Sequence, residues 1–442
     1  MKKVLLIQAL SMEGIDVERV YPIGLVTLAS LIERSGKYDI ELLDMNLELD
    51  AYGSVKNKLA EYKPDIIALS LRNLDPLGNR TNSMIVPFGV TLDLIKHLMP
   101  DVKIIVGGTA FSLFPERIMQ EFKQIDLGIV GEAENNIIEI LDNIECQIGT
   151  EGLIYRKGEK VIYNAQTKLF DMQDYKMPNR ELLSPTKYLK INKYVESVGV
   201  ETKRGCVFNC AYCSYPLLQG RCMRCRDAED VVDEIEYLKN TYGVTHIHLT
   251  DSIVNFPAKH LDDICRALIR RNVDIKWSGF FREDTITPKN AELYVKSGCE
   301  CFSLSPDGLT QSALDILDKK LSIDTILHTS KILADTDITS VYHFLINIPF
   351  DTEASFDESK RVIDQIYDIH SKSKTIGTIV LNLIRIMPRT KIQKLAIEEG
   401  FITEDTDLLF PIYYNPEKFR TKRYELEMYH NKQNVFIWND IK

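Results

Sequence analysis

The sequence lacks an excess of basic residues. Its 442 residues include 54 Lys and Arg against 64 Asp and Glu, which gives a formal net charge of -10 at pH 7. Proteins that bind nucleic acids usually display basic patches that neutralise phosphates. The composition therefore argues against DNA or RNA as a partner.

A long apolar run is also missing. The longest apolar stretch, residues 376–387, contains Asn382 and Arg385. It falls well short of the roughly 20 apolar residues that a transmembrane helix needs. We therefore expect no membrane partner and a soluble, cytoplasmic protein.

Cysteine is too sparse for a disulfide scaffold, because the chain has only nine. Small disulfide-stabilised domains carry a much higher density of cysteines. Five of the nine lie between positions 206 and 225. This clustering indicates a metal site in a reducing compartment, whereas Cys146 and Cys265 are expected to be isolated, ordinary thiols.

Four short apolar runs alternate with helical patterns in the first part of the chain. They lie at residues 4–7, 40–43, 65–70 and 103–108. Continuous apolar strands separated by helices indicate a parallel sheet that is covered on both faces. The sequence therefore predicts an α/β, doubly wound, Rossmann-like domain over residues 1–145.

A second alternation of strands and helices follows a different segment. Residues 146–194 are predicted to be a linker with a hairpin at Lys157 and Gly158. Residues 195–400 contain six strand candidates, at 198–201, 246–249, 276–279, 301–304, 340–346 and 378–383. Six βα units predict a closed or partial (βα)6 TIM-type barrel, and residues 401–442 are predicted to form a short cap.

Three cysteines follow the first strand of the predicted barrel. Cys206, Cys210 and Cys213 form a C-x3-C-x2-C motif in a loop at the end of the barrel where active sites lie. A fully protein-ligated iron-sulfur cluster uses four cysteines, so three leave one iron open, as catalytic metal sites do. The motif predicts a 4Fe-4S cluster. A structural zinc site with a remote fourth ligand, or coincidence, is the alternative.

This motif, with Tyr212 before its last cysteine, closely resembles the hallmark of the radical S-adenosylmethionine (SAM) superfamily. In that family the open iron binds the amino and carboxylate groups of SAM, and reductive cleavage of the sulfonium yields a 5′-deoxyadenosyl radical. The resemblance implies a radical SAM enzyme. It also implies an external electron donor, such as flavodoxin or ferredoxin.

Polar residues after successive strands extend the resemblance. Asp251 and Ser252 stand where family members contact the amino group of SAM, although Asp251 is equally suited to cap a helix. Arg282 resembles a residue that holds the SAM carboxylate, with a rim ion pair as the alternative. Ser305 and Asp307 are further candidate SAM contacts, because they stand where relatives often carry Gly-x-Glu-Ser, although the replacement of Glu by Asp leaves that role open.

The N-terminal part resembles the cobalamin-binding domain that precedes the barrel in a large subclass of these enzymes. The matching segments are 21–25, 64–70, 106–112 and 128–134. A doubly wound sheet binds ligands beyond the carboxyl ends of its strands, where small residues let the backbone approach a large macrocycle. The resemblance implies cobalamin contacts at Gly107, Gly108, Thr109, Gly131 and Glu132. The alternative is that these glycines only form tight turns.

The loop after the first strand has no histidine. Many cobalamin domains carry Asp-x-His-x-x-Gly there and ligate cobalt through the histidine, whereas residues 8–14 read Gln-Ala-Leu-Ser-Met-Glu-Gly. Cobalamin is then either bound without a lower protein ligand or contacted by the loop after the third strand. That loop resembles its counterpart in tryptophan methyltransferases of the subclass. Its candidates are Arg72, Asn73 and Leu74, unless Arg72 only pairs with a carboxylate.

A second cysteine pair, Cys222 and Cys225, has the C-x2-C spacing of half a four-thiolate site. The complementary pair would be Cys299 and Cys301. Those two residues start the fourth barrel strand, near the end opposite the cluster loop. We therefore favour unpaired cysteines near the active site over an auxiliary metal.

Together these features predict an enzyme that binds a 4Fe-4S cluster, SAM and cobalamin. The leading hypothesis is methylation of an unactivated carbon on a small-molecule or peptide substrate, with chemistry supplied by the cofactors. A second hypothesis keeps the cofactors but ends in cyclisation or rearrangement without methyl transfer. A third is a sensor that holds the cluster and cobalamin without turnover.

Overall fold

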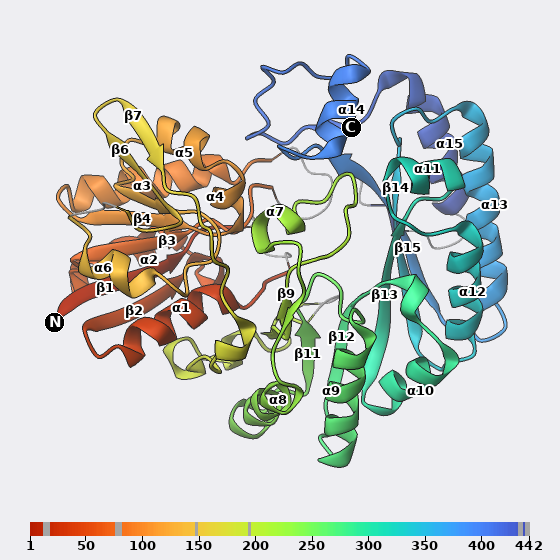
Figure 1. The fold of residues 1–442 in the computed structure, drawn as a ribbon, viewed down its shortest axis with the longest axis horizontal. Coiled ribbons are helices and arrows are strands. Elements are labelled where there is room, and N and C mark those ends of the chain that lie inside the picture. The colour runs from red at the N-terminus through yellow and green to blue at the C-terminus, as the bar shows by residue number, and fades with distance from the viewer. Residues whose placement is uncertain (12–17, 76–81, 146–148, 193–195, 432–435, 438–442) are drawn as a thin grey trace. The chain divides into compact units, whose positions relative to one another are not determined.

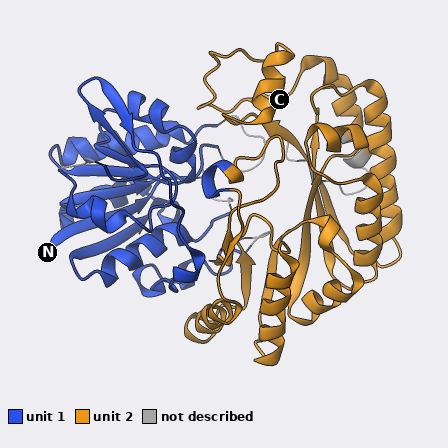
Figure 2. Cartoon of the chain, in the orientation of Figure 1, with its two compact units in different colours: residues 1–77, 82–197, 217–220 blue, residues 78–81, 198–216, 221–442 orange. Residues whose placement is uncertain are grey.

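The computed structural model describes residues 1–11, 18–75, 82–145, 149–192, 196–431 and 436–437 (Figure 1). It divides into two compact units (Figure 2). Unit 1 comprises residues 1–77, 82–197 and 217–220, and unit 2 comprises 78–81, 198–216 and 221–442. No helix among the described residues is long and apolar enough to cross a membrane. Cys146 lies outside the described residues.

Unit 1 is built on a seven-stranded sheet in the order β2-β1-β3-β4-β5-β6-β7. Its first five strands are parallel: β1 (Lys2–Gln8), β2 (Tyr38–Asp44), β3 (Ile66–Ser70), β4 (Lys103–Gly107) and β5 (Leu127–Ile129). The consecutive residues Leu5 and Leu6 point to opposite faces of the sheet, and both are buried. Both faces of the sheet are therefore covered. The predicted doubly wound sheet is confirmed.

The helices of unit 1 connect these strands. They are α1 (Ile23–Arg34), α2 (Ala51–Tyr62), α3 (Ile85–Leu98), α4 (Thr109–Leu113), α5 (Pro115–Glu121) and α6 (Ile137–Asp142), with a 3-10 turn η1 (Met45–Leu47). Helices α1 and α6 share one apolar core with the strands, in which Ala29 and Ile32 of α1 meet Ile137 and Ile140 of α6. This packing fixes α1 and α6 against the sheet.

The segment predicted as a linker begins with two strands of the unit 1 sheet, so that part of the prediction is wrong. Strands β6 (Leu153–Lys157) and β7 (Lys160–Tyr163) form the expected hairpin, with Lys157 opposite Lys160. Strand β6 also pairs antiparallel with β5. The free edge of a short parallel strand exposes unpaired backbone groups, and the hairpin satisfies them.

The rest of that segment lies against unit 1 as a series of 3-10 turns. These are η2 (Met172–Asp174), η3 (Arg180–Leu182) and η4 (Pro185–Tyr188). Arg180 is fully buried over the ring of Tyr21, and the Tyr188 hydroxyl donates to Asp44 Oδ2 at 2.5 Å. These buried polar contacts attach the segment firmly to unit 1.

Unit 2 is built on a partly closed parallel barrel. Its six parallel strands are β8 (Gly199–Val200), β11 (His246–Leu249), β12 (Lys276–Phe281), β13 (Cys299–Asp307), β14 (Thr339–Ile346) and β15 (Ile376–Arg385). The strand order β16-β15-β14-β13-β12-β11-β8 leaves β8 at one end of the path. The predicted partial (βα)6 barrel is confirmed for the described residues.

The tail of unit 2 adds two short strands to the barrel sheet. Strand β16 (Tyr413–Tyr414) pairs antiparallel with β15, and β17 (Phe436–Ile437) pairs parallel with it. Tyr414 is fully buried and packs on Phe401 with ring centroids 5.0 Å apart. The tail therefore closes the β15 edge.

Helices cover the outside of the barrel (Figure 1). They are α8 (Ala228–Tyr242), α9 (Ala258–Arg270), α10 (Pro288–Lys296), α11 (Gln311–Ile316), α12 (Ile323–Ala334), α13 (Glu353–His370), α14 (Lys391–Glu398) and α15 (Arg420–Asn431), with η5 (Glu283–Thr285) and η6 (Glu417–Phe419). Alternate strand residues such as Trp277, Phe302 and Phe344 are buried. The period-two alternation of burial along β12 and β14 separates these residues from the half-buried ones of the other face.

A buried ion pair fixes the start of α8. The Arg226 guanidinium donates to Glu234 Oε2 at 2.7 Å and to the carbonyl of Glu201 at 2.7 Å. The side chains of Arg226 and Glu234 are 2% and 0% exposed. The pair joins α8 to the end of β8, just before the cysteine loop begins.

We predict that Glu234→Ala lowers the free energy of unfolding by about 3–5 kcal/mol, because it removes the buried carboxylate that accepts a hydrogen bond from the buried Arg226 guanidinium. Glu229→Ala in the same helix removes exposed pairs to Arg270 and Arg271. That control should cost at most about 1 kcal/mol. Urea unfolding of both variants measures the difference, and equal losses would contradict the prediction.

Candidate functional site

The cysteine loop begins directly after β8 and the first strand of a two-stranded ribbon. The ribbon consists of β9 (Lys203–Arg204) and β10 (Arg224–Cys225), which pair antiparallel. Cys206 is buried, and Cys210 and Cys213 are half-buried. The loop therefore holds its three thiols at the carboxyl end of the barrel strands, as the sequence predicts.

Burial raises the pKa of all three thiols, to about 12 for Cys213. Backbone N–H groups of Phe208 and Tyr215 bond to the sulfurs of Cys206 and Cys213, which lowers the pKa of each in part. Metals bind thiolates, so loading a metal here would release protons. Hydrogen bonds to cluster sulfurs are one of the features that set the potential of an iron-sulfur centre.

The three thiols face a common region. Ionised Cys206 and Cys210 each raise the pKa of Cys213 through space. No set of three or more His, Cys, Asp or Glu side chains in the described part of the chain is arranged around a single metal ion. Cysteines that each bind a different iron of a cluster do not need to converge on one point. The donor set of three thiols on one short loop fits an iron-sulfur cluster.

The backbone of the loop is anchored at Ala211, which is buried between Cys210 and Cys213. Its N–H donates to the carbonyl of Leu317 at 2.8 Å, and its carbonyl accepts from the N–H of Ile392 at 2.9 Å. Leu317 follows α11 and Ile392 lies in the first turn of α14. Two segments far apart in the sequence therefore hold the loop from both sides.

Asp307 holds the loop through Tyr212. The Tyr212 hydroxyl donates to the Asp307 carboxylate, which also accepts from Lys319 Nζ at 2.6 Å. Lys319 Nζ donates to the carbonyl of Ser305 at 2.7 Å as well. Asp307 has a left-handed φ of 65° at the end of β13. The two residues predicted to contact SAM on this strand thus form a buried bridge to the cysteine loop.

Arg282 holds the loop through Phe208. Its guanidinium lies over the Phe208 ring at 3.9 Å and is only 3% exposed. It pairs with Asp284 at 2.8 Å and donates to the carbonyls of Lys319 and Lys320 at 2.8 and 3.2 Å. The ion pair that the sequence left as an alternative is therefore present, but it is buried rather than at the rim.

Asp251 holds the start of the loop. Its carboxylate accepts from the N–H groups of Thr202 and Lys203 at 2.8 and 3.1 Å and from the Thr202 hydroxyl at 2.5 Å. The Ser252 hydroxyl donates to the carbonyl of Gly205, next to Cys206. Asp251 is buried and caps no helix. Both of its carboxylate oxygens already accept hydrogen bonds from the protein.

The second cysteine pair lies near this end of the barrel. Cys225 is half-buried opposite Lys203 in the ribbon, and Cys222 is exposed. Cys299 and Cys301 start β13, whereas the end of that strand contacts the cysteine loop. The sequence correctly placed the two pairs at opposite ends of the barrel. Cys265 is not isolated as expected: burial raises the pKa of Cys299, and the nearby Cys301 and Cys265 thiols raise it further.

Sequence reasoning missed a group of rings along the strands of the barrel. His248 Nδ1 lies 3.0 Å from the Ser278 hydroxyl, and the rings of His248 and His343 lie edge-on to Phe280 at 5.7 and 5.8 Å. Burial lowers the pKa of both histidines, to about 4 for His248, so both are neutral at pH 7. Their half-buried positions in the alternating burial pattern of β11 and β14 were the available signal.

In unit 1, the candidate cobalamin residues lie after neighbouring parallel strands. Gln8, Ser70 and Gly107 end β1, β3 and β4 and lie side by side in register. Loops that follow these ends meet at one edge of the sheet, where doubly wound sheets bind ligands. This places the 72–74 loop and residues 107–109 together, as the sequence predicts.

The fold itself requires a glycine at position 108. Its φ is +104°, and a Cβ there would lie 2.5 Å from the carbonyl oxygen of Leu71. The same carbonyl accepts from the N–H of Ala110 at 3.1 Å, and the Thr109 hydroxyl donates to the carbonyl of Arg72 at 2.6 Å. Gly108 therefore lets the loop after β3 approach the start of α4. By contrast, a Cβ on Gly107 would meet only ordinary contacts.

Gly131 and Glu132 both contact the segment that follows β7. A Cβ on Gly131, whose φ is +86°, would lie 2.4 Å from Gln166 Oε1. Glu132 is buried, and its carboxylate accepts from the N–H of Phe170 at 2.8 Å. These two residues hold the segment after β7. The tight-turn alternative thus explains Gly108 and Gly131 without a ligand.

The three residues of the 72–74 loop differ from one another in solvent exposure. Leu74 is buried and its carbonyl accepts from the N–H of Met84 at 2.6 Å, whereas Arg72 is exposed and Asn73 half-buried. Thr109 is exposed as well. Within the 72–74 loop and residues 107–109, the side chains that are not buried are therefore those of Arg72, Asn73 and Thr109.

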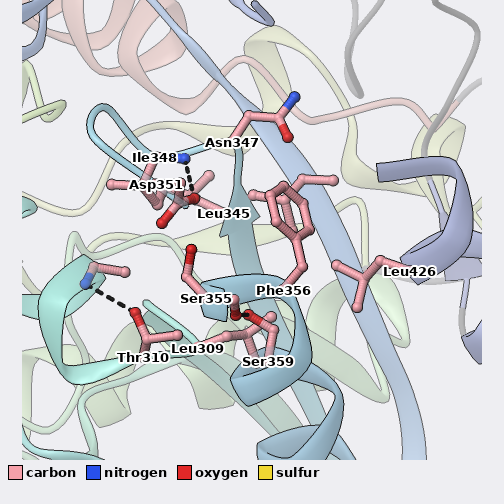
Figure 3. A pocket seen from close by; sticks show the side chains of 12 residues that line it. Leu309, Thr310, Leu345, Asn347, Ile348, Asp351, Ser355, Phe356, Ser359 and Leu426 are labelled. Carbon is pink, nitrogen blue, oxygen red and sulfur yellow. Dashed lines mark hydrogen bonds between the residues drawn. The ribbon is translucent and has the colours of Figure 1, made fainter. Parts of the chain in front are cut away.

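A separate small pocket lies at the end of β14 (Figure 3). Three of its polar side chains bond to backbone: Asp351 accepts from the N–H of Ile348, Thr310 accepts from the N–H of Ala313, and Ser359 donates to the carbonyl of Ser355. Asn347 donates to the Asn415 side chain, and its own Oδ1 is buried without a hydrogen bond to any described residue.

Two family models match this chain. The Radical SAM superfamily matches residues 200–363, and the B12 binding domain matches residues 17–141. These ranges coincide with the regions that carry the cysteine loop and the unit 1 sheet edge. An uncharacterized methyltransferase of Pyrococcus horikoshii is 25% identical over 362 residues, which cover 81% of this chain and 76% of that protein.

Two further relatives differ in their reactions. The anaerobic magnesium-protoporphyrin IX monomethyl ester cyclase of Cereibacter sphaeroides is 24% identical over 77% of this chain, which spans 56% of that protein's length. The radical SAM methyltransferase TsrM of Kitasatospora setae, solved with cobalamin and a [4Fe-4S] cluster, has a TM-score of 0.75 and 19% identity, covering 99% of this chain and 83% of TsrM. At that identity the likeness establishes the fold.

We predict that Asp251→Ala lowers the free energy of unfolding by about 3–5 kcal/mol in the absence of any ligand, because it leaves Lys203 buried without its carboxylate. Asp263→Ala removes exposed pairs to Lys259 and Arg266 and should cost at most about 1 kcal/mol. Chemical unfolding measures both. A ligand-free Asp251→Ala protein of unchanged stability would instead support a direct role in ligand binding.

We also predict that Gly108→Ala destabilises the protein by about 3 kcal/mol or more, since it combines a left-handed φ with a clash against the Leu71 carbonyl. Gly149→Ala has a similar positive φ, +92°, but open space around it. This control should cost about 1 kcal/mol. Thermal unfolding distinguishes the two, and equal costs would show that the close approach to Leu71 is unimportant.

Proposed function

This chain is a radical SAM enzyme with a B12-binding domain, and we propose that it transfers a methyl group to an unactivated carbon of a small molecule or peptide. The observation that carries the proposal is the cysteine loop, whose three thiols lie at the carboxyl end of a partial barrel. Its relatives include a methyltransferase of similar length.

The cofactors would bind at two places. Cys206, Cys210 and Cys213 would ligate the 4Fe-4S cluster, and the sheet edge of unit 1 with Arg72 and Thr109 would contact cobalamin. When bound, the cluster supplies electrons to SAM and cobalamin carries the methyl group, while the protein positions them. An external donor such as flavodoxin or ferredoxin would supply the electrons, which suits a reducing compartment such as the cytoplasm.

The residues of this chain would act mainly by holding groups in place. Asp251, Arg282 and Asp307 each hold a different part of the cysteine loop, so the thiols keep one arrangement. Pre-organisation of this kind limits the motion that must be lost before the reaction. We assign Asp251 and Arg282 to this positioning role in preference to direct contact with SAM.

We propose that the substrate binds near the rings of Phe280, His248 and His343. The ring nitrogens of His343 make no hydrogen bond within the part of the chain that the structure describes, so they are available to a ligand. Both imidazoles are neutral at pH 7 because burial lowers their pKa. These groups suit an uncharged part of a substrate with hydrogen-bonding groups.

A second candidate function keeps the cofactors without methyl transfer. The similarity to a cyclase, at 24% identity, favours this alternative. The two functions differ in the fate of the methyl group of SAM. They can therefore be separated before the substrate is known.

We predict that the reconstituted, reduced protein transfers a labelled methyl group from SAM to protein-bound cobalamin and releases S-adenosylhomocysteine. The measurement is anaerobic incubation with methyl-labelled SAM, followed by separation of the cobalamin fraction. Formation of 5′-deoxyadenosine with no label on cobalamin would favour the non-methylating function. Formation of neither product would favour a sensor.

We predict that Cys210→Ala abolishes assembly of the cluster, since two cysteines cannot hold three irons. Cys222→Ala is the matched control, because Cys222 is an exposed thiol outside the motif. Iron and sulfide analysis after anaerobic reconstitution, with the optical spectrum, measures both variants. Loss of iron in Cys222→Ala as well would indicate an auxiliary cluster.

A further inference from the structure

The carboxylate of Glu283 is buried without a partner. Glu283 starts η5, immediately after Arg282, and is 1% exposed. Neither of its two carboxylate oxygens makes a hydrogen bond. An unpaired buried charge is costly, so such a carboxyl group is close to taking up a proton.

The nearest cations are already paired. Lys319 donates to Asp307 and to the carbonyl of Ser305, and Arg282 pairs with Asp284. Each of these two cations therefore has one carboxylate of its own. An ionised Glu283 would add a negative charge with no counterion.

The other groups around Glu283 do not compensate its charge. Tyr342 on β14 faces it and has its own pKa raised, mainly by burial and partly by Glu283. Thr329 of α12 donates to the backbone carbonyl of Glu283 at 3.0 Å, not to its carboxylate. Burial raises the pKa of Glu283 to about 7, whereas Lys319, the residue's own backbone N–H and Arg282 lower it and Asp307 raises it.

Glu283 is electrostatically linked to the cysteine loop through Lys319. Burial alone would lower the pKa of Lys319, but Asp307, Cys210 and Glu283 together raise it. Lys319 thus responds to charge on Cys210 and to charge on Glu283 at once. An electron added beside Cys210 would increase the negative charge in the same buried region.

We propose that Glu283 takes up a proton when the cluster held by Cys206, Cys210 and Cys213 is reduced. This inference rests on the proposed cluster and extends it to the control of its reduction. A low-potential one-electron donor supplies one electron to the cluster, and solvent supplies one proton to the Glu283 carboxylate. No bond other than the new O–H bond forms, and the added charge in the buried region is neutralised.

The test measures the reduction potential of the reconstituted protein as a function of pH. Electron paramagnetic resonance monitors the reduced cluster in each titration, from roughly pH 6 to pH 9. Negative charge on the reduced cluster raises the pKa of Glu283 further, so the reduced state binds the proton over a range above the oxidised-state pKa. In that range the potential of the native protein should fall with rising pH. The slope should approach about 59 mV per pH unit, which is one proton per electron.

Glu283→Gln keeps the shape of the side chain but cannot titrate. Its potential should not change with pH and should lie above that of the native protein at alkaline pH. Glu300→Gln, at the opposite end of β13, is the matched control and should keep the native slope. If Glu283→Gln shows the native slope of potential against pH, instead of a potential that does not change with pH, the proposal is overturned.

A measurement on the native protein covers the case in which Glu283→Gln does not fold. The reduced-minus-oxidised infrared difference spectrum should contain the carbonyl stretch of a newly protonated carboxylic acid. Its absence, or a potential that is independent of pH in the native protein, would overturn the inference while leaving the proposed function intact. Failure to assemble any cluster would overturn the proposed function and this inference together.

Discussion

The arrangement of the site depends on one constraint: the cysteine loop has almost no regular structure of its own. Residues 206–213 form neither helix nor strand, so nothing local fixes the three thiols. Contacts from distant segments supply that order, through the carboxylates of Asp251 and Asp307, the Arg282 guanidinium and the backbone at Ala211. Because most of these groups lie near the ends of different strands, the loop can be ordered only when the barrel has formed.

The same contacts explain the unusual density of buried charge beneath the loop. Lys203, Arg282 and Lys319 are all at least nine-tenths buried, and each lies beside a carboxylate. Buried pairs contribute little net stability compared with apolar packing, but breaking one is expensive. Such a network therefore favours one arrangement of the loop over others. It also creates a region of low polarity in which a single added charge has a large effect.

The sequence was sufficient for the fold, but only in part for the site. Apolar runs and their spacing predicted the parallel strands of both units, because burial on both faces leaves a clear pattern. The same reasoning missed that β6 and β7 extend the unit 1 sheet. The sequence pattern of a hairpin of mixed polarity, such as residues 153–163, is the same whether or not the hairpin joins a larger sheet. It found Asp251, Arg282 and Asp307 by their place after strands. Their partners Thr202, Lys319 and Tyr212 lie 49, 37 and 95 residues away, respectively, and no local pattern contains that information.

Glycines and buried polar residues have different structural roles in the two units. This difference affects which side chains a ligand can contact. At the unit 1 sheet edge, Gly108 serves the approach of Leu71, so the conformational freedom of glycine is already used within the fold. Among the described residues of that edge, Arg72, Asn73 and Thr109 keep accessible side chains, and these are the groups that we propose to recognise a ligand there. Recognition by exposed side chains on a rigid edge requires no rearrangement of the sheet, whereas the buried anchors of the cysteine loop cannot reach a ligand without releasing the loop. The residues that anchor the cysteine loop and those that we propose to contact cobalamin are therefore different sets, and sequence position alone does not separate them.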